Sequence, residues 1–131
     1  MFLPKECDYA IRVVRGLSDM GIKSVRIICE LEKVPQHFAY KILKKLERAG
    51  IVNSYRGAEG GYQLAKTLDS ITLFDIVSAV NKQLLLSECL KKGFICVRNS
   101  NGNSCGVHRE LIRVQALLME ALNEKTMDKL K

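Results

Sequence analysis

The sequence has no tryptophan, only two prolines and few aromatic residues, which make up 6% of its 131 residues. No apolar run approaches the ~20 residues that a membrane-spanning helix needs. The first residues also lack the basic stretch and apolar core of a signal peptide, so we expect a cytoplasmic protein. A hydrophobic content of 47% and a charged content of 27% are typical of a folded globular chain.

Histidine is scarce, and the residue sets of common catalytic sites are missing. The two histidines are His37 and His108. The first lies in a basic helical pattern and the second beside cysteines, which leaves no histidine for general base catalysis. The chain shows no nucleotide-binding glycine motif, no triad spacing and no carboxylate pair. We therefore expect a protein that is not an enzyme.

Cysteine is well represented, but its five residues cannot all pair within one chain, and cytosolic thiols stay reduced. Cys7 and Cys29 fall within helical patterns, which favours ordinary core positions. The other three lie in one polar segment close to His108, with the spacing C-x6-C-x8-C-x2-H: Cys89, Cys96 and Cys105. Thiolates and imidazole are ligands for zinc and for iron–sulfur clusters. The segment is therefore a candidate metal or redox-sensing site.

The positive charge is concentrated in one part of the chain. The net charge is +7, and residues 33–56 carry six basic residues against one acid, Glu47. The rest of the sequence is nearly balanced. A local basic patch on a near-neutral chain indicates a surface for a polyanion, although a solvated lysine-rich helix face has the same composition.

Hydrophobic periodicity predicts three helices, over residues 6–20, 25–31 and 35–50, with Gly21 and Gly50 as stops and Ser24 as an N-cap. Pro35 suits the first turn of the third helix. Alternation and three glycines predict a β-hairpin over residues 51–65, and Thr72 precedes a further helix to Val80. Three helices followed by a glycine-rich hairpin is the element order of a winged helix-turn-helix domain.

In a winged domain the third helix enters the major groove and the hairpin contacts the flanking DNA. Polar residues early in that helix suit base edges, and the later basic residues suit phosphates. Arg56 at the hairpin tip suits a minor groove, and the glycines there allow backbone N–H groups to approach phosphates. The predicted DNA-binding residues are Gln36, His37, Tyr40, Lys41, Lys44, Arg56, Gly57 and Gly60, with Lys45 and Arg48 as further phosphate or flanking contacts.

The C-terminal region predicts a long helix from Val107. Its apolar residues recur at steps of four and three, a heptad-like seam formed by Val107, Leu111, Val114, Leu118 and Ala121. Leu117 and Leu122 widen this stripe, which favours a dimerisation helix. Packing of the same helix on its own domain is the alternative.

Three motifs resemble the IscR/NsrR-type regulators of the Rrf family, bacterial winged helix-turn-helix transcription regulators. Residues 8–12, Asp-Tyr-Ala-Ile-Arg, are similar to the first helix of that family. Phe38-x-x-Lys41-Ile42-Leu43-x-x-Leu46-x-x-Ala49-Gly50 resembles its recognition helix. The wing signature is matched by Arg56-Gly57-x-x-Gly60-Gly61-Tyr62-x-Leu64-Ala65. The resemblance continues through the cysteine segment to the C-terminal helix and covers nearly the whole chain.

The resemblance implies a homodimeric DNA-binding repressor or dual regulator with a [2Fe–2S] or [4Fe–4S] cluster on Cys89, Cys96 and Cys105. Some family members use a histidine at the position of His108 as the fourth ligand, and others an acidic residue of the partner subunit, which Asp8 matches. The spacing here is longer than the common C-x5-C-x5-C. The expected signal is cluster supply, iron, nitric oxide or redox state. A cluster-free regulator controlled by a partner protein, thiol oxidation or a zinc site is the alternative.

Together these patterns predict a mostly α fold with a small β-hairpin wing. Residues 1–82 are expected to form the winged helix-turn-helix DNA-binding domain. Residues 83–106 would form the cysteine-containing, cluster-binding loop, and residues 107–131 the dimerisation helix and tail. The expected partners are a double-stranded DNA operator and a second copy of the chain, without a membrane.

Overall fold

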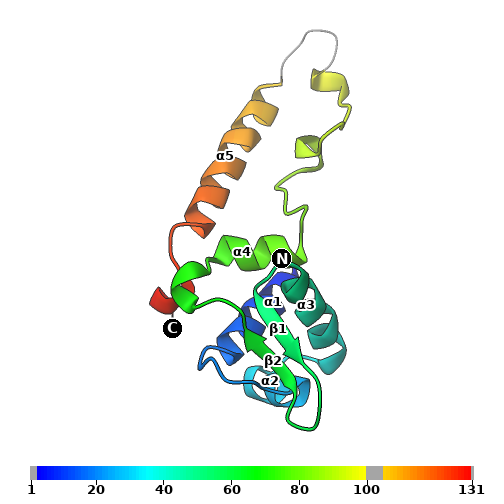
Figure 1. The fold of residues 1–131 in the computed structure, drawn as a ribbon. Coiled ribbons are helices and arrows are strands. Elements are labelled where there is room, and N and C mark those ends of the chain that lie inside the picture. The colour runs from blue at the N-terminus through cyan, green and yellow to red at the C-terminus, as the bar shows by residue number, and fades with distance from the viewer. Residues whose placement is uncertain (1–2, 100–104, 131) are drawn as a thin grey trace.

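A computed structural model describes residues 3–99 and 105–130 of the chain. Figure 1 shows a helical body with a two-stranded hairpin and a long helix that extends from it. The main elements are α1 (Lys5–Gly16), α2 (Val25–Glu32), α3 (Gln36–Arg48), β1 (Val52–Tyr55), β2 (Gly61–Leu64), α4 (Leu73–Val80) and α5 (Gly106–Leu122). The mostly α fold with a β-hairpin wing is thereby confirmed.

The core lies where α1, α2, α3 and α4 meet. Each helix contributes one apolar stripe because its apolar residues recur at steps of three and four. On α1 the buried stripe begins with Cys7 and Ala10, and on α3 it is formed by Ala39, Ile42, Leu43 and Leu46. No polar or charged residue is buried among the described residues. The opposite face of α3 is thus left exposed beside the wing.

The turns between these helices follow local capping chemistry. The Ser24 hydroxyl accepts a hydrogen bond from the N–H of Ile27 and begins α2. Pro35 is the residue before α3 rather than a member of its first turn, and Gly50, with φ of 77°, follows its end. Helix α1 stops at Gly16, earlier than predicted, because the N–H of Gly21 donates to the Asp19 carboxylate and stabilises a turn there.

The hairpin is anchored to the body by a third extended segment. Strands β1 and β2 pair antiparallel, with Val52 opposite Leu64. Lys23, between α1 and α2, exchanges two backbone hydrogen bonds with Tyr62, at 2.9 and 2.8 Å. Gln63 also donates its side-chain amide to the carbonyl of Met20 at 2.5 Å. The orientation of the wing therefore depends on the turn between α1 and α2.

Beyond α4 the chain runs outward and returns along α5, so that the two segments lie side by side in Figure 1. The outward segment is irregular apart from the short 3-10 helices Glu88–Leu90 and Val97–Asn99. Gln115 of α5 clamps its start: its amide donates to the Leu84 carbonyl and its carbonyl accepts from the Leu86 N–H, both at 2.9 Å. Residues 100–104 of the predicted cysteine-containing loop lie outside the described residues.

The end of the chain returns to the body beside α4. Thr72 and Asp75 form a capping box at the start of α4, and the Thr72 hydroxyl contacts Asn123 after α5. Met127 is buried in the core, and its N–H donates to the Ile71 carbonyl at 2.7 Å. Both ends of the segment from α4 to residue 130 are therefore fixed to the winged body.

Candidate cysteine pocket and DNA-binding surface

The three cysteines of the polar segment and His108 line one cavity of about 520 Å³, named here the cysteine pocket. Cys89 comes from the first short 3-10 helix of the outward segment, Cys96 precedes the second, and Cys105 is the residue before α5. Apolar side chains of the outward segment and of α5 complete the wall: Leu90, Phe94, Ile95, Val107, Leu111 and Ile112. Residues far apart in the segment thus converge on one space.

The donor chemistry of this pocket fits a metal group. Three thiols and an imidazole suit tetrahedral zinc, and three thiolates with one other donor suit an iron–sulfur cluster. No three ligand-type side chains of the described residues are close enough together to hold a metal ion. The cysteine pocket therefore has suitable donors around one cavity. Ligation requires the outward segment and the start of α5 to move closer together around the group.

The two remaining cysteines, Cys7 and Cys29, lie in the winged body and not in the cysteine pocket. Cys7 is buried in the core, and Cys29 of α2 is half-buried against it. Burial raises the pKa of the Cys7 thiol, and the neighbouring Glu6 carboxylate raises it further. Burial likewise raises the pKa of Cys29. Both side chains pack within the winged body, as their place in helical patterns predicts.

This difference predicts a difference in thiol reactivity. Because the thiolate is the reactive form, the buried Cys7 should be alkylated far more slowly than Cys89 or Cys96 in the native, metal-free protein. Timed iodoacetamide labelling followed by peptide mass spectrometry measures the rates residue by residue. Equal rates at Cys7 and Cys96 in native protein would contradict the burial, and labelling in denaturant provides the reference for full exposure.

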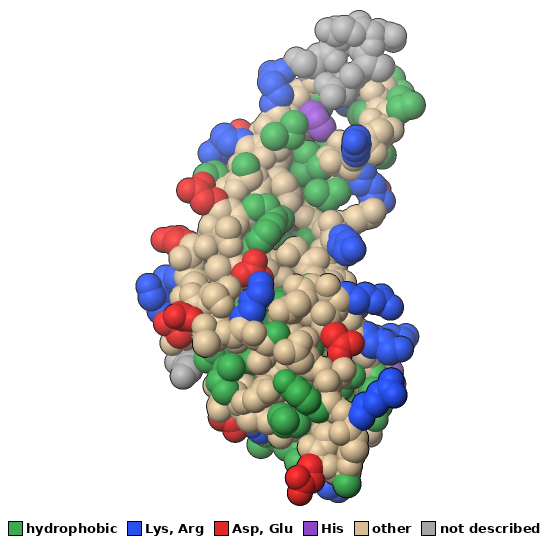
Figure 2. Space-filling view, in the orientation of Figure 1, with side chains coloured by type: hydrophobic (Ala, Val, Ile, Leu, Met, Phe, Trp, Pro, Cys, Tyr) green, Lys and Arg blue, Asp and Glu red, His purple; other side chains and the backbone are tan. Residues whose placement is uncertain are grey.

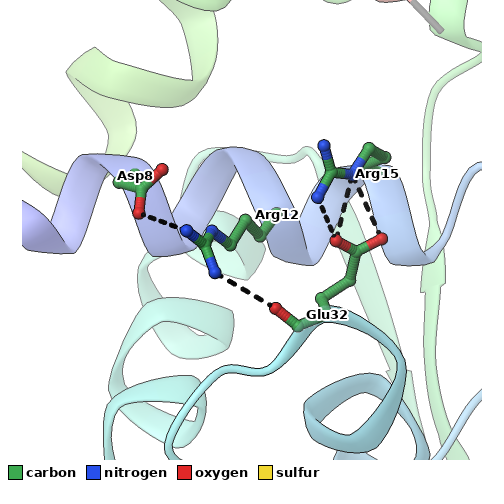
Figure 3. A network of polar contacts seen from close by, with 4 residues as sticks. All are labelled: Asp8, Arg12, Arg15 and Glu32. Atoms are coloured by element: carbon green, nitrogen blue, oxygen red, sulfur yellow. Dashed lines mark hydrogen bonds and ion pairs between the residues drawn. The ribbon is translucent and has the colours of Figure 1, made fainter.

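Asp8, the alternative fourth ligand, lies on α1 and not in the cysteine pocket of its own chain. Its carboxylate pairs with Arg12 at 3.2 Å, and Arg12 also donates to the backbone carbonyl of Glu32 at 3.4 Å. The Glu32 side chain is in turn held by Arg15, as Figure 3 shows. This network joins α1 to the end of α2, where the turn into the recognition helix begins.

The predicted DNA-contacting residues of α3 share its exposed face. Gln36, His37, Tyr40, Lys41 and Lys44 are all exposed. The Gln36 amide approaches the Tyr40 hydroxyl at 3.5 Å, and the ring of His37 lies 4.5 Å from that of Phe38. In Figure 2, Lys and Arg side chains gather along the edge of the molecule on the side of α3. The face presents polar donors first and cations further along the helix.

The hairpin places the other predicted DNA contacts at its turn. Arg56 and Gly57 are exposed, and Gly57 has a φ of 105°. The N–H of Gly60 donates to the Gly57 carbonyl at 3.0 Å and closes the turn. A Cβ atom on Gly60 would collide with the Tyr55 carbonyl oxygen, so the tight turn requires glycine there.

Lys45 has a role that its sequence context does not reveal. Its ammonium group bonds the Glu6 carboxylate at 2.6 Å and the Val80 carbonyl at 3.3 Å. The side chain therefore ties α3 to α1 and α4 instead of extending toward DNA. Charge on a helix face cannot show this, because the acidic partner is 39 positions away in the chain. The Gln115 clamp is equally invisible in the sequence.

Helix α5 leaves much of its apolar surface uncovered within one chain. None of its residues is fully buried. Of the predicted seam, Leu111 and Leu118 are half-buried, whereas Val107 and Val114 are exposed. Ile112 and Leu117 are each 49% exposed. A helix with this much exposed apolar surface has a face available for a partner.

Known proteins are similar to this chain in sequence and in fold. Residues 3–131 match the Rrf2 family, described as iron-dependent transcriptional regulators. Protein aau3 of Rhizobium meliloti is 34% identical over 132 residues, covering 99% of this chain and 84% of that protein. The regulator NsrR of Oceanobacillus iheyensis is 29% identical, with 99% and 89% covered.

A solved structure agrees with these relatives. CymR of Bacillus subtilis, titled the global cysteine regulator, superposes with a TM-score of 0.74 at 25% identity, over 97% of this chain and 93% of CymR. No helix in residues 3–99 or 105–130 is long and apolar enough to cross a membrane. The matched family and NsrR are transcriptional regulators, not enzymes. The winged fold, the family motifs and these matches agree: the chain belongs to the Rrf2 family of DNA-binding transcriptional regulators.

Proposed function

We propose that the chain is a homodimeric repressor that senses iron–sulfur cluster supply, iron, nitric oxide or redox state through a cluster bound in the cysteine pocket. The observation that carries this proposal is the convergence of Cys89, Cys96, Cys105 and His108 on one cavity. The description of the family as iron-dependent supports iron as the metal. A cluster bound there would supply a group that oxidants, nitric oxide or iron shortage can alter or remove.

His108 is the proposed fourth ligand because it lines the same cavity as the three thiols. Asp8 of the partner subunit is the alternative, and its use would first require release from Arg12. Imidazole and carboxylate are each protonated or displaced more easily than thiolate. Either residue would therefore make the fourth position the labile one.

The proposed dimer uses the uncovered apolar side of α5. Val114 and Leu117 lie on that side, one helical turn apart. Burial of such a surface against a second copy would contribute roughly 25 cal/mol per Å². Pairing through α5 would set two recognition helices at a fixed separation, as operator half-sites require.

The regulatory step is a population shift. Closure of Cys89, Cys96 and Cys105 on a bound group would draw the outward segment toward the start of α5. The hydrogen bonds of Gln115 would make α5 move together with that segment. The contacts of α4 with α1 and α3 would transmit this movement to the winged body. Two arrangements of the recognition helices with different operator affinities would then exchange population.

For DNA binding we expect Lys44 to contact phosphate and not bases. Changing Lys44→Gln should therefore weaken binding to specific and random duplexes alike, and should reduce the slope of log affinity against log salt by about 0.9. Fluorescence anisotropy across a salt series measures both. Lys125→Gln, at an exposed site after α5, is the charge-matched control. An unchanged slope for Lys44→Gln would contradict the predicted contact.

Metal and sulfide analysis tests the cofactor directly. Protein purified without oxygen should absorb visible light and contain iron and acid-labile sulfide in similar amounts. Zinc without iron would instead indicate a structural Cys3His site. Absence of both zinc and a cluster, even after reconstitution with iron and sulfide, would contradict the cluster proposal. DNA binding by the same samples separates the cofactor question from the regulatory one.

A second candidate is a cluster-free regulator of the same family, controlled by a partner protein, by thiol oxidation or by a zinc site. The superposition on CymR, a protein titled as a cysteine regulator, favours it. So does the separation of the ligand-type side chains in the described part of the chain. The same metal and sulfide analysis distinguishes the two candidates.

A further inference from the structure

A second cleft, separate from the cysteine pocket, lies where the start of α1 meets the ends of α3 and α4. Its volume is about 710 Å³, larger than that of the cysteine pocket. Glu6 comes from the first turn of α1, Arg48 from the end of α3, and Lys66 follows β2. Asn81 and Lys82 close the far side just after α4. This space is named here the basic cleft.

The charged side chains of the basic cleft differ in whether they have a hydrogen-bond or ion-pair partner in the described part of the chain. Its lining contains four cations and two carboxylates, a net charge of +2: Lys45, Arg48, Lys66, Lys82, Glu6 and Asp75. Glu6 is bonded to Lys45, and Asp75 accepts from the Thr72 N–H at 3.0 Å. Arg48, Lys66 and Lys82 have no hydrogen bond or ion pair with the described part of the chain. The carboxylates are thus engaged and three cations are available.

The position of the basic cleft separates it from the DNA-binding surface. Gln36 and His37 begin α3, whereas Arg48, predicted from the sequence only as a further phosphate or flanking contact, ends it, and a helix of 13 residues spans about 20 Å. Lys66 adjoins the base of the hairpin, where the N–H of Ala65 bonds the Ile51 carbonyl, and not the turn at Gly57. DNA held by the start of α3 and the wing tip would leave the cleft open.

We propose that the basic cleft binds a small anionic metabolite that carries phosphate or carboxylate groups. Arg48, Lys66 and Lys82 would contact its charged oxygens, because charge-assisted hydrogen bonds are the strong ones. The side-chain amide of Gln83 at the rim would contact its polar groups. A bound anion would also compete with Glu6 for Lys45, which joins the recognition helix to α1 and α4. Ligand in this cleft would therefore act on the packing of the recognition helix.

Titration calorimetry with inorganic pyrophosphate and with citrate tests the proposal on the full chain at constant ionic strength. Saturable binding at one site per chain is expected for at least one probe. The double variant Arg48→Gln/Lys82→Gln should weaken it by about tenfold or more, since each change removes a charged donor. The charge-matched control Lys125→Gln/Lys129→Gln alters exposed residues elsewhere and should bind like the wild type.

Each contrary result has a defined meaning. Absence of saturable binding by both probes would overturn the proposal and leave the cations as partners of the helix ends, whose carbonyl groups favour positive charge. Equal weakening in the control variant would show general electrostatic attraction and would also overturn it. Weakening by Lys41→Gln/Lys44→Gln in place of Arg48→Gln/Lys82→Gln would move the anion to the DNA-binding face. Thermal unfolding of each variant checks that it is folded.

Discussion

Replacing Gly61 with alanine is expected to detach the wing from the body and to lower the free energy of unfolding by at least about 3 kcal/mol. Gly61 has a φ of 152°, which side chains rarely adopt, and a Cβ atom there would collide with the backbone carbonyl of Lys23. That carbonyl accepts the Tyr62 N–H, so relief of the collision would break the link between the hairpin and the α1–α2 turn. Specific DNA binding should be lost with it.

Chemical denaturation and DNA binding measure these two effects. Gly57→Ala is the matched control because Gly57 also has a positive φ, 105°, but no atom lies within 4 Å of its added Cβ. The control should show only the cost of backbone strain, on the order of 1 kcal/mol. If Gly61→Ala proves as stable as Gly57→Ala and binds DNA normally, the proposed anchoring of the wing is wrong.

The second large effect is expected for Cys96→Ala. If the cysteine pocket binds a cluster, removal of one of three thiolates should abolish the visible absorption and most of the bound iron and sulfide. The fold should survive, because Cys96 is only half-buried and lies in the outward segment. Anaerobic reconstitution with iron and sulfide, followed by absorption and circular dichroism, records cluster and fold in one sample.

Cys29→Ala provides the matched control, because Cys29 is also half-buried but belongs to the winged body. It should keep the cluster. His108→Ala and Asp8→Ala then distinguish the two candidates for the fourth ligand. The variant that lacks the actual ligand should lose its cluster faster in air. Full iron and sulfide content in Cys96→Ala would remove Cys96 from the site.

The sequence predicts the elements well where one periodicity dominates. The apolar stripe of α3 and the capping residue Ser24 appear in the structure as expected. Alternation and glycines place the hairpin correctly to within a residue or two. The end of α1 is missed because a side-chain turn at Asp19, and not a glycine alone, competes with the helix.

The candidate site is predictable only in part. Spacing indicates that Cys89, Cys96 and Cys105 belong together, but only the fold shows that they share a cavity with His108. Long-range polar contacts have no sequence period, so the engagement of Lys45 by Glu6 is not predictable. The basic cleft is hidden for the same reason, since its cations come from three separate segments of the chain.

We propose that a group bound in the cysteine pocket controls the affinity of the chain for DNA. The test is the affinity of cluster-loaded and metal-free wild-type protein for a duplex selected from random sequence, measured without oxygen beside Cys96→Ala. We expect the affinities of the two wild-type forms to differ by about fivefold or more, the usual size of such coupling, and Cys96→Ala to behave as the metal-free form under both conditions. Identical affinities for all samples, with the cluster demonstrably present in the wild type, would contradict it.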